Sequence, residues 1–183
     1  MGIRYKFNEA KTTEAGLILL SLDGGEMDKV RLMKLLYLAD RESLDQRLLP
    51  ITGDTYYCME HGPVLSTVLH MMNLESHSHG AIWRKAIELR GYKCAALRQH
   101  ETAEHLSEAE VDILRQLSQQ FFGYDTWKLR DYTHAHCQEY NDTEPNKRSA
   151  LRVEAVLRAL GKAESDIEPA HELAILQSLS NEC

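Results

Sequence analysis

The residues of this sequence that could do chemistry are a few histidines and cysteines, and their spacing argues against a metal site. His134, His136 and Cys137 are potential metal ligands. On a helix, however, His134 and Cys137 would share one face while His136 points elsewhere. The sequence has no second cluster at the spacing of a zinc site. We therefore predict no metal site and no bound cofactor.

A thiol nucleophile with a nearby base is the second kind of site to consider. Cys58 and His61 are three positions apart, so in an extended segment their side chains face opposite sides. No third group that would orient the base can be identified. A phosphate-binding loop is also missing, because Gly24-Gly25 lacks the Lys and Ser/Thr of a P-loop. We predict that the chain is not an enzyme, and a hydrolase using His134 or Cys58 is the least favoured alternative.

The composition predicts a cytoplasmic protein with an ordinary core. A chain of 183 residues can bury a full hydrophobic core, and no apolar run approaches the roughly 20 residues that span a membrane. The first ten residues, MGIRYKFNEA, lack the apolar stretch of a secretory signal. The four cysteines are widely spaced, so we expect reduced thiols at Cys58, Cys94, Cys137 and Cys183.

The net charge of −7 is unevenly distributed. Residues 1–98 are close to neutral, so the acidity lies in residues 99–183. An acidic surface does not grip a phosphate backbone, which argues against nucleic acid as a partner. It is compatible with a basic protein partner, although a solvated acidic face is the more common explanation of such a charge distribution.

The sequence offers few candidates for a catalytic or metal site, but it contains one long apolar stretch around which the fold is organised. This stretch is Val30–Asp40, which reads VRLMKLLYLAD. Its residue types favour helix, and apolar side chains occur on almost every side of that helix. We predict that a helix from Asp28 to about Arg47 runs through the middle of the domain. Leu36 is one of the core residues that this predicts.

Turn and capping residues place the other elements around this helix. We expect four further helices and two extended regions in the first 140 residues, the helices covering Asn8–Leu22, Pro63–Glu75, Ser107–Phe121 and Thr126–His136. The extended regions are Thr55–Met59 and a hairpin around Gly91. The fold class is therefore mainly α (α+β), a compact helical domain around a central buried helix with a small β element and C-terminal helices.

The C-terminal part follows a polar stretch, Asn141–Lys147, which contains Pro145 and is the best linker candidate. We predict a domain of residues 1–144 and a helical extension of residues 145–183. The extension should hold one amphipathic helix over Leu151–Leu160 and another starting at Pro169. Their apolar stripes either complete the core of the domain or, for the final helix, dock in a groove of a partner.

Three short motifs together carry a family resemblance. KLLYLAD at Lys34–Asp40, PITGDTY at Pro50–Tyr56 and HGPV at His61–Val64 occur in this order within about thirty residues. The set resembles the Panacea domain, the SocA-like antitoxin domain also found in phage GepA-like proteins. Thr133-His134 is similar to a second, weaker signature, after which the family pattern has a tryptophan where this sequence offers Tyr140.

The resemblance implies a mainly helical antitoxin that neutralises a cognate toxin protein by direct binding, without catalysis. The alternative that it leaves open is a proteolytic adaptor that delivers the toxin to a AAA+ protease. It leaves homo-oligomerisation open as well. The motif residues that we consider as partner contacts are Tyr37, Asp54, Tyr56, His61 and His134, with buried structural roles as the alternative for each.

Overall fold

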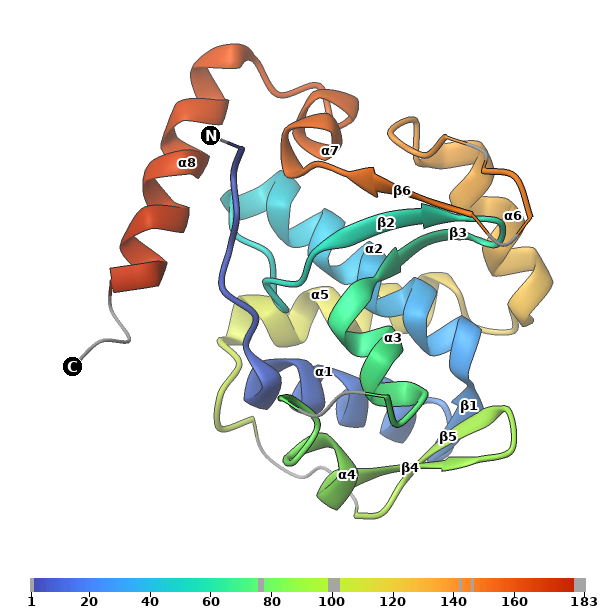
Figure 1. The fold of residues 1–183 in the computed structure, drawn as a ribbon. Coiled ribbons are helices and arrows are strands. Elements are labelled where there is room, and N and C mark those ends of the chain that lie inside the picture. The colour runs from blue at the N-terminus through green and yellow to red at the C-terminus, as the bar shows by residue number, and fades with distance from the viewer. Residues whose placement is uncertain (1, 76–77, 99–102, 142, 146, 180–183) are drawn as a thin grey trace.

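The computed structural model describes residues 2–75, 78–98, 103–141, 143–145 and 147–179, and its centre is helix α2, Lys29–Arg47 (Figure 1). The helix begins where the Asp28 carboxylate accepts hydrogen bonds from the Val30 and Arg31 amides at 2.8 and 3.4 Å. Every residue from 31 to 40 is buried. The prediction of a central buried helix is therefore confirmed, and with it the mainly helical α+β fold class.

Other helices surround α2 and bury its apolar sides. The elements in contact with it include three helices from the first 140 residues, α1 (Glu9–Leu22), α5 (Glu108–Gln120) and α6 (Thr126–His136). Two predicted caps are present, since the Asn8 side chain accepts from the Lys11 amide and Ser107 with Glu110 forms a capping box. The local signals thus set the helix starts, while the shared apolar core brings the helices together.

Two small antiparallel sheets complete the domain. One has the order β3-β2-β6, and its strands are β2 (Tyr56–Met59), β3 (Gly62–Leu65) and β6 (Arg148–Leu151). The other has the order β1-β5-β4, and its strands are β1 (Glu26–Asp28), β4 (Ile87–Arg90) and β5 (Lys93–Ala96). The predicted extended segment and the hairpin turn at Gly91, with φ of 63°, are both confirmed. The first arm of the hairpin, expected over Ile82–Ile87, is wrong, because Trp83–Ala86 form helix α4 and the strand begins at Ile87.

The expectation that Pro63 starts a helix is wrong. Pro63 lies in β3, paired with Cys58, and helix α3 covers only Ser66–Met72. The strand β3 is at the edge of its sheet, where a residue without an N–H is tolerated. The cap that the helix needs comes instead from Asp54, as described below.

The C-terminal segment differs from its prediction in two ways. Residues Arg148–Leu151 form a strand that pairs with β2, so the next helix, α7, covers Val153–Ala159 rather than starting at Leu151. The last helix, α8, covers Glu164–Leu179 and contains Pro169 instead of beginning there. Its actual start is marked by the Asp166 carboxylate, which accepts from the Ala163 amide at 2.9 Å.

The two C-terminal helices also separate into a buried one and an exposed one. In α7 the side chains of Val156 and Leu157 are fully buried in the common core. In α8 only Ala170 and Ala174 are buried, and Leu176 and Leu179 face solvent. A boundary near residue 144 stays a proposal, but β6 and α7 pack with the elements that precede it.

Leu36 gives a direct test of the central helix. Its side chain is fully buried, so we expect Leu36→Ala to lower the free energy of unfolding by about 2–5 kcal/mol through lost burial and a new cavity. Urea denaturation measures the change. Leu22→Ala, at an exposed leucine at the end of α1, is the control and should cost well under half as much. Equal effects of the two substitutions would contradict the central role of α2.

Candidate functional site

Asp40, the last residue of the KLLYLAD motif, holds the Pro50–Asp54 turn against α2. Its buried carboxylate accepts hydrogen bonds from the Thr52 amide at 2.8 Å, the Thr52 hydroxyl, and the Tyr56 hydroxyl at 3.1 Å. Burial raises the pKa of Asp40 to about 7, although these hydrogen bonds oppose the shift. The first two motifs are therefore one hydrogen-bonded unit in space.

Asp54 acts as the missing cap of helix α3. Its carboxylate accepts from the Thr67 amide at 3.0 Å and the Val68 amide at 2.9 Å, both in the first turn of α3. It also accepts from the Thr55 amide at 2.7 Å. Burial raises the pKa of Asp54, and the hydrogen bonds from Thr67 and Val68 work against this. Asp54 thus fixes the start of α3 and does not face solvent.

Lys34 binds the backbone of the HGPV motif. The fully buried Lys34 ammonium donates to the Pro63 carbonyl oxygen at 2.7 Å. Gly62 lies directly above it with φ of 97°, and a Cβ at that position would lie 3.0 Å from Lys34 Nζ and 3.0 Å from Thr133 Oγ1. The close approach and the positive φ explain why this position holds glycine. The β2–β3 hairpin is therefore seated on α2 and α6.

Tyr37 connects the segment after α6 to the central helix. Its hydroxyl donates to Glu139 Oε1 at 2.7 Å, and the same carboxylate pairs with Arg41 Nε at 2.8 Å. Burial, followed by the nearby Glu139 charge, raises the pKa of Tyr37. The ring of Tyr37 also meets Tyr56 edge to face, with centroids 5.6 Å apart. Both tyrosines are fully buried, so their hydroxyls serve internal contacts.

The two histidines among the predicted contact residues are more accessible. His61 is exposed at the tip of the β2–β3 hairpin, and its ring meets the edge of Trp127 with centroids 5.9 Å apart. His134 is half-buried, and its ring centroid lies 4.4 Å from that of Tyr140. Tyr140 donates its hydroxyl hydrogen to the Met59 carbonyl at 2.9 Å. It therefore helps to hold the hairpin.

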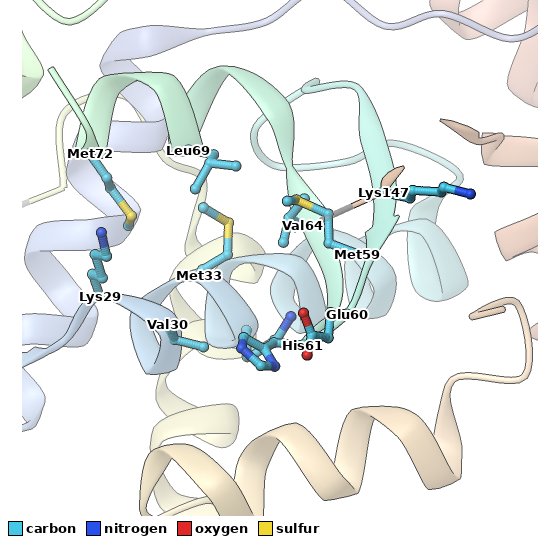
Figure 2. Close-up of a pocket in the computed structure, with 11 residues that line it drawn as sticks. Lys29, Val30, Met33, Met59, Glu60, His61, Val64, Leu69, Met72 and Lys147 are labelled. Carbon is cyan, nitrogen blue, oxygen red and sulfur yellow. The ribbon is translucent and has the colours of Figure 1, made fainter. Parts of the chain in front are cut away.

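An apolar pocket of about 260 Å³ opens beside this hairpin, between α2, α3 and β2 (Figure 2). Its apolar lining is rich in methionine and comprises Met33, Met59, Val64, Leu69 and Met72. Charged or polar side chains that also line it include Lys29, Glu60 and His61. The volume is close to the lower limit of the roughly 300–1,000 Å³ usual for small-molecule sites.

Comparison with protein families matches residues 32–139 to the family described as "Antitoxin SocA-like, Panacea domain". This span covers more than half of the chain and includes all three motifs. The chain belongs to this family. Neither the comparison with curated proteins nor that with solved structures gives a match. Membership in an antitoxin-like family supports a role in a toxin–antitoxin system and suggests a non-enzymatic one.

The surface of this Panacea domain next to the pocket carries exposed aromatic side chains. Trp127, at the start of α6, is 58 % exposed, and the Arg130 guanidinium lies 5.0 Å from the centroid of its ring. Phe122 and Tyr124 are exposed in the preceding turn. Because His61 contacts Trp127 and also lines the pocket, the pocket and Trp127 form one continuous surface. We call this surface, defined by the pocket, His61 and Trp127, the hairpin face.

Sequence reasoning missed Trp127 and the methionines of the pocket. A helical projection would have found Trp127, since it lies opposite the buried Leu129 and so had to face solvent. No such signal marks Met33, which belongs to the central helix like its buried neighbours. Its place at a pocket depends on how α3 crosses α2, which the sequence pattern does not encode.

The described thiols of the Panacea domain are buried. Cys58, Cys94 and Cys137 are buried and free, while Cys183 lies outside the described residues. Burial raises the pKa of Cys137 to about 12, which keeps this thiol protonated at neutral pH. Among the residues that the structure describes, no group of three or more His, Cys, Asp or Glu could hold a metal ion. In the same part of the chain, no helix is long and apolar enough to cross a membrane.

Lys34 makes the stability of the domain depend on pH. Burial lowers the pKa of Lys34 from 10.5 to about 7, so between these values the folded state binds fewer protons than the unfolded state. The contribution of Lys34 to the free energy of unfolding is therefore lowest below pH 7, and it rises as the pH increases above 7. Asp40 acts in the lower range: its raised pKa makes stability fall as pH rises from 3.8 to about 7.

We expect Lys34→Met to remove the rise that Lys34 causes above pH 7. The free energy of unfolding of the wild type should gain about 2 kcal/mol relative to the variant between pH 7 and about pH 9. Urea denaturation of both proteins across this range measures the difference, in which contributions shared by the two proteins cancel. Lys85→Met, at an exposed lysine, is the control and should show no trend. A difference between wild type and Lys34→Met that is constant with pH would contradict the lowered pKa.

Proposed function

We propose that this protein is an antitoxin that neutralises a cognate toxin protein by direct binding, without catalysing a reaction. The observation that carries the proposal is the family match across residues 32–139. The chemistry of the site supports it, since the hairpin face combines an apolar pocket with exposed aromatics and lacks an activated nucleophile among the groups described above. We expect neutralisation to take place in the cytoplasm.

We further propose that the toxin binds the hairpin face. Tryptophan, tyrosine and arginine dominate the energetics of protein interfaces, and Trp127 with the stacked Arg130 has this composition. Methionine side chains adapt to different partner shapes, which suits a pocket that receives protein side chains. Both features lie beside His61, which is the most exposed of the five motif residues considered as contacts.

The buried motif residues then have a positioning role in the proposal. Tyr37, Asp54 and Tyr56 are buried and engaged in internal hydrogen bonds, so a rigid partner could reach them only after a rearrangement. We propose that they hold the β2–β3 hairpin and α3 in place, and that His61 is the motif residue that contacts the toxin. His134 would act through Tyr140 and the hairpin backbone.

Growth rescue tests the proposal. The protein encoded next to this chain should arrest growth when expressed alone, and co-expression of this chain should restore growth. We expect the double variant His61→Ala/Trp127→Ala to weaken binding of that protein by about tenfold or more and to lose rescue. Ile82→Ala, at an exposed apolar residue before helix α4 (Trp83–Ala86), is the matched control and should behave as wild type.

The outcomes separate the parts of the proposal. Absence of rescue by the soluble wild type would overturn the antitoxin function. Rescue by the double variant, with unchanged affinity and an unchanged melting temperature, would remove the hairpin face as the binding surface. The lifetime of the toxin distinguishes direct binding from delivery to a AAA+ protease, because a lifetime shortened by co-expression would replace neutralisation by binding with the adaptor mechanism.

A further inference from the structure

Helix α8 is attached to the domain through its small residues. Ala170 and Ala174 are buried against the N-terminal segment, where the Tyr5 hydroxyl shares its hydrogen between the Leu48 carbonyl and, at 3.2 Å, the Ala170 carbonyl. The Lys6 amide donates to Gln177 Oε1 at 3.1 Å. Figure 1 shows α8 at the outside of the molecule, beyond this N-terminal segment. One side of the helix is therefore fixed, and the opposite side looks away from the domain.

The outward side of α8 has a regular pattern. Glu168, Glu172, Ile175 and Leu179 follow at spacings of four, three and four residues, which places them along one helix face. Ile175 is at the edge of this face, because it also lines a cavity with Ala174 and the N-terminal segment. Leu176 flanks this row. The three apolar side chains are 48 % exposed at Ile175, 61 % at Leu176 and 58 % at Leu179. The face is thus acidic in its first half and apolar in its second half.

The charges of α8 are not balanced within the described part of the chain. The helix contains no Lys or Arg. Glu164 pairs with Arg158, and Asp166 caps the start of the helix through the Ala163 amide. Glu168 and Glu172 form no ion pair with any described residue, and both are exposed. They present two uncompensated negative charges next to an apolar strip.

This charge pattern argues against a second copy of the same chain as the partner of α8 and favours a different, basic protein. If two copies paired through α8 in parallel, each glutamate would face a glutamate. If they paired in antiparallel orientation, the glutamates would be desolvated against leucines with no cation in the helix to compensate. A basic partner removes both problems, because Lys or Arg beside an apolar groove would pair with Glu168 and Glu172.

We propose that the outward face of α8, formed by Glu168, Glu172, Ile175, Leu176 and Leu179, docks in an apolar groove rimmed by Lys or Arg on the toxin. This inference rests on the proposed antitoxin function. It gives the toxin a second contact, on α8, in addition to the hairpin face. Amphipathic helices commonly bind in this way, with apolar anchors at spacings of three and four residues. Since α8 lies beyond residue 139, this contact is supplied from outside the family match.

Substitution of exposed leucines tests the docking without disturbing the core. We expect Leu176→Ser/Leu179→Ser to keep the wild-type melting temperature, because both side chains are exposed, and to weaken binding of the purified neighbouring-gene product by about tenfold. Leu22→Ser, at an exposed leucine of α1, is the matched control and should bind as wild type. Isothermal titration calorimetry gives the affinities and growth rescue gives the functional result.

A second variant tests the charges independently. We expect Glu168→Gln/Glu172→Gln to weaken binding at low salt and to make the affinity less dependent on salt concentration, since exposed ion pairs are screened by salt. An unchanged salt dependence would contradict the basic rim. This variant keeps the apolar residues, so it remains informative even if the leucine variant proves unstable.

The possible results are distinct. A wild type that binds and rescues, together with a leucine variant that does so equally well, overturns the docking of α8 and leaves the antitoxin function intact. A wild type that neither binds nor rescues overturns the proposed function and this inference with it. Light scattering that shows a homodimer dissociated by Leu176→Ser/Leu179→Ser would assign the face to a second copy of the chain and overturn the proposed occupant.

Discussion

The constraint on which this structure depends is that α2 carries three ionisable side chains into the buried centre of the domain. Lys34, Tyr37 and Asp40 are all fully buried, and a buried polar group without a hydrogen-bond partner costs about 1–3 kcal/mol or more. Each finds its partner in a different segment: Lys34 at Pro63, Tyr37 at Glu139 and Asp40 at Thr52. The helix therefore orders the hairpin, the end of α6 and the Pro50–Asp54 turn together.

This arrangement explains why the three sequence motifs belong together. In KLLYLAD, the polar residues make the hydrogen bonds to the other segments, and the apolar residues form the core between them. HGPV supplies the Pro63 carbonyl, which accepts a hydrogen bond from Lys34. It also supplies Gly62, which has no Cβ and can therefore lie close to the Lys34 ammonium. PITGDTY supplies Thr52 and Tyr56 to Asp40, and it carries Asp54 to the start of α3. What looks in sequence like a set of binding residues is largely the internal bonding of the scaffold.

Sequence reasoning succeeded where the signal is local and failed where it depends on a distant partner. The central helix, the Asn8 cap and the capping box at Ser107 all follow from neighbouring residues, and they are present. Strand β6 could not be foreseen, because RSAL has little strand preference and is ordered by pairing with β2. Helix α3 was misplaced for a similar reason, since its cap, Asp54, lies twelve residues before its first residue. For the site, His61 could be named from its motif, whereas the pocket beside it depends on how α3 crosses α2.

The attachment of α8 to the N-terminal segment has a consequence for how the protein is made. The hydrogen bonds from Tyr5 to Ala170 and from Lys6 to Gln177 join residues 165 and 171 positions apart. Contacts of such long range are entropically costly to close and form late in folding. On the ribosome Tyr5 emerges 165 residues before Ala170, so α8 covers the N-terminal segment only after the residues between them have been made. The body around α2 can then fold before α8 is attached to it.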